Sequence, residues 1–209
     1  MRRVLIRSLA PLLISVPAFA QYKAGPAGPP PSGIAPAIAQ VLGKTGFQIS
    51  GASGPYCEIW FRSSLPSGPP TSEQNVTLPT VPVGTLLGVI RFDGDGADRR
   101  GQTIKAGVYT LRYAIMPTSG NHEGAAPQRD FVLLVPSAED PNPSSLPKFD
   151  DLLNMSRKAS RTPHPAVMSI WKADTDAPGF SQQGDTDWVL ETKIGDTPIA
   201  IILVGAVSS

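Results

Sequence analysis

Two histidines and two methionines stand where the sequence could hold a soft metal ion. Met116 directly precedes a glycine-containing loop, residues 117–128, which carries His122. His164 lies between two prolines, four residues before Met168. Copper takes imidazole and thioether ligands, and zinc also takes imidazole. If the two loops meet in space, both histidines and one methionine form a copper or zinc site. If they do not meet, each histidine is expected to hydrogen-bond loop backbone.

Other patterns of metal ligands fit less well. A blue-copper site would need the only cysteine, but Cys57 lies far upstream of both histidines on an apolar strand face. Residues 93–98 place three aspartates on a glycine-rich turn that resembles a calcium loop. Arg99 and Arg100 follow at once and would oppose a cation, so the turn is predicted to pair its aspartates with arginines.

An aromatic pair suggests a different kind of site. Tyr56 and Trp60 fall on one face of a predicted strand, and exposed aromatic rings beside polar groups can stack sugar rings. The alternative is that this face is covered by another element, because large aromatic side chains are mostly buried. Asn121 and Glu123, on the same loop as His122, are further candidates for ligand binding.

The sequence does not favour an enzyme. No Gly-x-Ser-x-Gly motif is present, and the spacing of the acidic residues selects no catalytic pair of carboxylates. No catalytic residue is therefore proposed, and no cofactor beyond a copper or zinc ion is indicated.

The candidate binding residues must be positioned by short segments in which apolar and polar residues alternate, separated by proline and glycine. Together they predict an all-β, single-domain antiparallel β-sandwich of about eight or nine strands. One short helix is expected at residues 147–159, because Pro147 fits a first turn and acidic residues precede basic ones. The main predicted strands are Phe47–Ser50, Tyr56–Arg62, Leu86–Phe92, Thr103–Met116, Phe131–Val135, Ala166–Trp171, Trp188–Ile194 and Ile199–Val204.

The amino-terminal residues have the pattern of a secretory signal. Residues 1–20 hold three arginines, then an apolar stretch, then small residues at the positions a signal peptidase reads, so cleavage is expected after Ala20. Residues 21–33 are rich in proline and glycine and are expected to form a flexible tail, with the β-sandwich domain at 34–209. The protein is thus predicted to be exported, to the periplasm or beyond the cell.

Charge and hydropathy restrict the partners. Without residues 1–20 the formal net charge falls by three, from +1 to −2, which does not suit nucleic-acid binding. The longest later apolar run, Ile199–Val204, is too short for a transmembrane segment. The partner is unknown, with another exported protein or a glycan as the expected classes.

Most of the chain after residue 20 resembles a known group of proteins. The run RGQTIKAGVYTLRY at 100–113, followed by GNHEG at 120–124 and RDF at 129–131, is similar to exported bacterial proteins without an assigned function. The resemblance implies a periplasmic or extracellular β-domain and carries over no catalytic residue. The sequence therefore predicts a secreted, non-enzymatic binding or structural module. The alternatives are an exported metal-binding protein and a carbohydrate-binding module or hydrolase.

Overall fold

The computed structural model describes residues 21–118 and 128–206, and its main element is one ten-stranded antiparallel sheet. Its strands are β1 (Lys23–Ala27), β2 (Gly46–Gly51), β3 (Gly54–Phe61), β4 (Leu86–Phe92), β7 (Gly107–Ile115), β8 (Asp130–Pro136), β9 (Val167–Lys172), β10 (Gly179–Gln183), β11 (Asp187–Ile194) and β12 (Thr197–Val204). Two short strands pair only with each other, β5 (Gly96–Ala97) and β6 (Thr103–Ile104). The helices are α1 (Pro36–Val41), the 3-10 helix η1 (Ser137–Glu139) and α2 (Phe149–Ser160).

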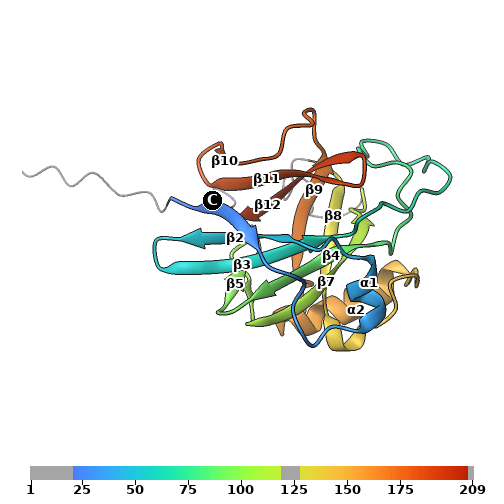
Figure 1. Ribbon diagram of the computed structural model, residues 1–209. Coiled ribbons are helices and arrows are strands. Elements are labelled where there is room, and N and C mark those ends of the chain that lie inside the picture. The colour runs from blue at the N-terminus through green and yellow to red at the C-terminus, as the bar shows by residue number, and fades with distance from the viewer. Residues whose placement is uncertain (1–20, 119–127, 207–209) are drawn as a thin grey trace, which may run out of the picture.

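The sheet curls until its two ends nearly meet. Its strand order is β1-β2-β3-β4-β7-β8-β9-β12-β11-β10. Figure 1 shows β1, in blue, opposite β10 and β11, in brown, so that the sheet is nearly closed into a barrel. The rings of Tyr22 and Trp188 touch edge to face across the remaining gap, with centroids 5.7 Å apart. The all-β prediction is confirmed, but the β-sandwich of eight or nine strands is wrong.

Irregular pairing explains how one sheet can curl this far. The register shifts between Ile49 and Ser50 in β2, between Leu86 and Gly88 in β4, and between Trp188 and Val189 in β11. A β-bulge bends its strand and increases the local right-handed twist. A single sheet with such bends can therefore enclose its own inner face. A β-sandwich instead buries its inner faces by stacking two separate sheets.

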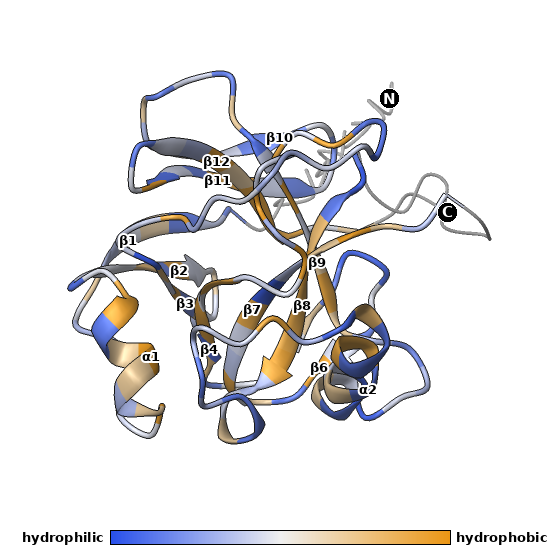
Figure 2. Ribbon diagram, turned by 90° about the vertical axis from the view of Figure 1, so that its right-hand side faces the viewer, coloured by the Kyte–Doolittle hydropathy of each residue, from blue (hydrophilic) through white to orange (hydrophobic). Residues whose placement is uncertain are grey.

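The two most apolar strands are covered on both faces, as their composition predicts. In β8, Val132 and Leu134 belong to the main core inside the curled sheet, while Leu133 and Val135 pack on the outer face beneath α2. The strand β12 alternates in the same way between the main core and a smaller outer cluster. Figure 2 shows β8 as largely hydrophobic.

The helix α2 lies within two residues of the predicted span 147–159. Its Leu152 is fully buried against Phe131 and other apolar residues of β8. Two acidic residues in its first turn and two basic residues in its last turn match the helix dipole. In the described part of the chain, no helix combines the length and apolar character that crossing a membrane requires.

The expected flexible tail at residues 21–33 is wrong for its first part. Lys23–Ala27 is β1, an edge strand paired in register with β2. This segment has little apolar content of its own, but backbone pairing with β2 satisfies the polar groups along its inner edge. The carbonyl of Gly28 also accepts a hydrogen bond from the Trp60 indole at 2.9 Å. The residues 1–20, with the predicted signal, lie outside the described residues.

Two buried carboxylates attach long loops to the sheet. Asp130 accepts hydrogen bonds from the backbone N–H groups of Thr77 and Leu78, at 2.8 and 3.0 Å. Asp140 forms a buried ion pair with Arg112 of β7. The first contact holds the loop between β3 and β4, and the second holds the segment that leads from β8 to α2.

Candidate functional site

A cavity of about 290 Å³ lies between α2, the end of β7, and the strands β8 and β9. We call it the α2 cavity. Its rings Phe131 and Phe149 meet edge to face, with centroids 6.3 Å apart. Binding sites for small molecules are typically concave and mostly apolar, with a few polar groups that orient the ligand. The apolar wall of this one is made by Met116, Phe131, Phe149, Leu153, Val167 and Met168.

Every charged side chain that lines the α2 cavity in the described residues is basic. Arg99, Arg100 and Arg157 contribute guanidinium groups, and His164 contributes an imidazole. No aspartate or glutamate is found among the described lining residues. Guanidinium groups bind carboxylate, sulfonate and phosphate oxygens through charge-assisted hydrogen bonds. The rim therefore suits an anionic group, while the wall suits an apolar one.

Asp98 fixes the position of Arg100. Its carboxylate is fully buried and accepts hydrogen bonds from Nη2 of Arg100 at 2.8 Å and from the Arg100 backbone N–H at 3.0 Å. The same Nη2 donates to the Pro165 carbonyl at 2.8 Å. Within the described residues the Nε and Nη1 groups of Arg100 make no hydrogen bond, so these donors remain for a ligand. This pairing confirms the prediction of local aspartate–arginine pairing for Asp98 alone, because Asp95 pairs with Lys105 and Arg99 pairs with Asp187 of β11.

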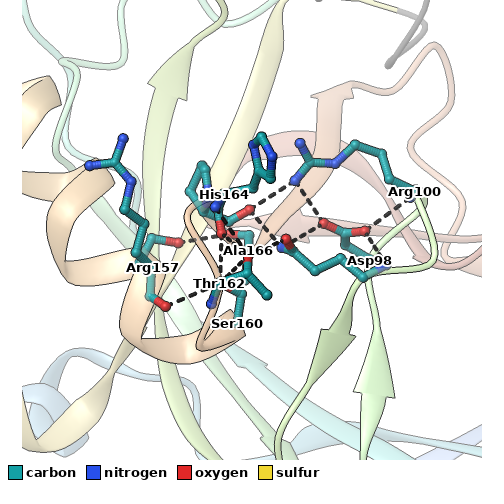
Figure 3. Close-up of polar contacts among 10 residues, drawn as sticks. Asp98, Arg100, Arg157, Ser160, Thr162, His164 and Ala166 are labelled. Atoms are coloured by element: carbon teal, nitrogen blue, oxygen red, sulfur yellow. Dashed lines mark hydrogen bonds and ion pairs between the residues drawn. The ribbon is translucent and has the colours of Figure 1, made fainter.

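The segment that carries His164 is held by its own polar groups, as Figure 3 shows. The His164 carbonyl accepts a hydrogen bond from Ser160 Oγ at 2.6 Å, and its backbone N–H donates to Thr162 Oγ1 at 3.0 Å. Thr162 Oγ1 also donates to Gln102 Oε1 at 2.7 Å, which ties the segment to the loop before β7. The side chain of His164 is exposed, and its imidazole makes no hydrogen bond to the described part of the chain.

Arg157 carries the charge that the described chain does not neutralise. It extends from the last turn of α2, where Nε donates to the Pro163 carbonyl at 2.8 Å and Nη1 donates to Asn154 Oδ1 at 2.6 Å. Among residues 21–118 and 128–206 no carboxylate pairs with it, whereas Arg100 is paired with Asp98. The two neutral oxygens orient Arg157 at the rim without cancelling its charge.

Three of the four residues predicted to bind metal lie around this same cavity. Met116, His164 and Met168 all belong to the lining, although they come from different elements. The fourth, His122, lies outside the described residues, as do Asn121 and Glu123. Within the described residues no group of three or more His, Cys, Asp or Glu side chains is placed to hold a metal ion.

The aromatic pair predicted to stack a ligand lies on opposite faces of the sheet. Trp60 is 1% exposed and packs with Ile38 of α1, which covers the outer face. Tyr56 packs against the main core and accepts a hydrogen bond from the Ala97 N–H at 3.1 Å. The bulge opposite Ile49 explains the difference, because one extra residue reverses the alternation of faces along β3. The two rings therefore form no shared stacking surface.

Burial of Tyr56 predicts that the folded protein loses stability as the pH rises above 10. Burial raises the pKa of Tyr56 from 10.0 to about 12, so the folded protein keeps a proton that the unfolded chain releases near pH 10. The contribution of this group is complete below pH 10 and is lost as the pH rises toward 12. We expect Tyr56→Phe to lower stability at pH 7 by about 1 kcal/mol through the lost hydrogen bond. Above pH 10 its stability should fall less steeply than that of the wild type, as urea unfolding can measure.

The arginines of the rim are the residues that sequence reasoning missed. The sequence predicts for Arg99 and Arg100 only that they oppose calcium and pair with the neighbouring aspartates, and for the basic end of the helix only that it matches the helix dipole. The signal that could have found them is the concentration of basic residues in three segments that flank the apolar strand β8.

Comparison with known proteins identifies no relative of this chain. It matches no family model, no curated protein and no solved structure.

Proposed function

We propose that this chain is an exported, non-enzymatic binding protein that holds a small amphipathic anion in the α2 cavity. The observation that carries the proposal is the lining itself, an apolar wall with a rim of three arginines and one histidine and without described carboxylates. The export part rests on the signal-like pattern of residues 1–20.

The size and polarity of the α2 cavity define the ligand class. A volume of about 290 Å³ lies at the lower end of typical ligand pockets. The apolar body of the ligand would contact Phe131, Phe149 and Leu153, while a carboxylate or sulfonate would reach Arg100 and Arg157. Aromatic acids and medium-chain fatty acids combine such a body with such a head group.

Binding is proposed in preference to turnover because of what the lining lacks. General acid–base catalysis uses a positioned side chain that gives or takes a proton, most often a histidine or a carboxylate. The described lining offers one imidazole, that of His164, and no carboxylate beside it. The arginines offer fixed N–H donors, which suit the orientation of an anion.

Substitution of Arg157 tests the proposal directly. We expect the wild type to bind the fluorescent anion anilinonaphthalene sulfonate, and decanoate to displace it. Arg157→Gln should weaken decanoate binding about tenfold or more, since a hydrogen bond to a charged group contributes about 1.5–3 kcal/mol. Decanol, which has no charge, should bind both proteins equally. Lys158→Gln is the matched control, because Lys158 neighbours Arg157 but pairs with Glu139 away from the cavity.

A second variant separates the cavity from the general surface charge. Leu153 is half-buried and lines the cavity from α2, so Leu153→Trp should fill the space and abolish displacement by decanoate. Binding that survives in Leu153→Trp, or that weakens equally in Arg157→Gln and Lys158→Gln, would contradict the proposal. Circular dichroism of each variant verifies that the sheet is intact.

A metal ion is the second candidate, because Met116, His164 and Met168 line one cavity. Thioether and imidazole ligands suit copper, and imidazole also suits zinc. The arginines of the same rim oppose a cation, which is why we place the anion first. Stoichiometric copper or zinc that is present in the wild type and absent from His164→Ala would favour this alternative.

A further inference from the structure

A second and larger cavity lies at the gap where the curled sheet fails to close. Its volume is about 820 Å³, and residues of β1 and β2 line one side while residues of β10 and β11 line the other. We call it the seam groove. Figures 1 and 2 both show β1 facing the β10–β11 side of the sheet. No part of it belongs to the α2 cavity, because the two share no lining residue.

Aromatic side chains line both sides of the seam groove. Tyr22 and Phe47 come from the β1–β2 side, and Phe180 and Trp188 from the β10–β11 side. All four are half-buried, so each has part of its surface in solvent. Trp188 contacts Phe180 at a centroid distance of 5.5 Å and Tyr22 at 5.7 Å, which orders the rings relative to one another. The groove thus presents fixed, partly exposed aromatic rings.

The groove carries almost no charge. Among the described residues Lys23 is the only charged side chain in its lining, and the other polar groups there are the Gln21 amide, the Thr45 and Tyr22 hydroxyls and the Trp188 indole N–H. This composition does not select an ionic ligand. It suits a neutral one whose surface combines C–H groups, which pack on aromatic rings, with groups that both donate and accept hydrogen bonds.

The two unpaired strand edges restrict the ligand further. β1 and β10 are the ends of the sheet, so each leaves the backbone groups of its outer edge without a strand partner in the described chain. Pro26 lacks an N–H group and Lys23 is an exposed charge, and both features of β1 disfavour the addition of another strand. Hydroxyl groups need no regular ladder, because each can donate to a carbonyl or accept from an N–H.

We propose that the seam groove binds a neutral oligosaccharide chain. The sugar rings pack against Trp188, Phe180 and Tyr22, and the sugar hydroxyls bond the free backbone groups of β1 and β10. This places the aromatic binding surface at the seam and not on β3, where Trp60 is buried. The proposal stands apart from the α2 cavity, so either site can bind without the other.

Titration with neutral hexasaccharides tests the inference. Cellohexaose, xylohexaose, laminarihexaose and chitohexaose are titrated separately, by isothermal calorimetry, into the purified protein of residues 21–209, the form left by the proposed cleavage. We expect saturable binding of at least one of them at a single site. Trp188→Ala should weaken that binding roughly tenfold, the change that corresponds to about 1.4 kcal/mol. Trp171→Ala is the matched control, because Trp171 is equally half-buried but packs outside the groove.

Each outcome decides between the alternatives. Loss of binding in Trp188→Ala with retention in Trp171→Ala supports the proposal. Phe180→Ala, on the edge strand, gives the same readout if Trp188→Ala does not fold. Failure of all four sugars to bind overturns the proposal, as does equal weakening in both tryptophan variants. Binding of an eight-residue threonine–valine repeat peptide in the groove, without any sugar binding, would identify it as a strand-docking site and also overturns the proposal.

Discussion

Replacing Arg112 with methionine is expected to lower the free energy of unfolding by about 3–5 kcal/mol, because it leaves the Asp140 carboxylate buried and unpaired. Arg112 is 0% exposed and Asp140 is 3% exposed. The guanidinium donates to both carboxylate oxygens, and also to the carbonyls of Gly84 and Ser145 at 2.9 and 2.8 Å. Urea unfolding followed by circular dichroism measures the loss.

Two further variants identify the cause of the effect. Arg112→Lys keeps the charge but lacks the planar fork that reaches several acceptors at once, so its stability should fall between those of the methionine variant and the wild type. Adding Asp140→Asn to Arg112→Met removes the unpaired charge and should recover part of the loss. A methionine variant that loses less than about 1 kcal/mol, the value of an exposed ion pair, would contradict the argument.

Asp130→Asn is expected to cost about 3 kcal/mol and to release the loop between β3 and β4. The Asp130 carboxylate is fully buried and accepts three hydrogen bonds, from the N–H groups of Thr77 and Leu78 and from the Tyr113 hydroxyl at 2.7 Å. An amide has only one acceptor oxygen, so its NH₂ group would face a backbone donor. Faster cleavage within residues 63–85 under limited proteolysis, together with lower stability in urea, reports both effects.

An exposed aspartate provides the comparison for Asp130. Asp174 is exposed and makes no ion pair in the described chain, so Asp174→Asn should leave both the proteolysis rate and the stability unchanged. Equal effects of the two substitutions would show that the loop does not depend on the buried carboxylate. Burial and hydrogen bonding by Asp130 also raise the pKa of Tyr113, which keeps its hydroxyl protonated as the donor.

The sequence predicts correctly those strands and helices whose conformation follows from their own residues and not from the strands beside them. The strands β8 and β12 were identified because continuous apolar runs need cover on both faces, and α2 because its charges and spacing agree. The strands β1 and β10 were missed because KAGPA and GFSQQ have neither alternation nor many apolar residues. Their conformation depends on the neighbouring strands β2 and β11, and single-sequence patterns do not record such pairing.

The same distinction applies to the site. The sequence predicts from residue types that His164, Met116 and Met168 are candidate metal ligands. All three line the same cavity in the structure. Their common neighbours Arg100 and Arg157 could not be assigned to it, because their segments meet only in the tertiary structure, where Arg100 bonds the Pro165 carbonyl and Thr162 bonds Gln102. For Tyr56 and Trp60 the period-two rule failed at a bulge, and a bulge of this kind leaves no clear mark in the sequence.

The near-closure of the sheet has a consequence for the order in which the chain folds. Its two ends are β1, close to the start of the described chain, and β10, close to its finish, and they meet through Tyr22 and Trp188. Three neighbouring pairs, β2–β3, β10–β11 and β11–β12, are joined by short turns, and the other pairs are joined by longer segments that still lie far inside the span from β1 to β10. The contact between the two ends closes the longest loop in the described fold, so its entropic cost is the largest. We therefore expect the seam to form last, after the final strands have left the ribosome or the export channel.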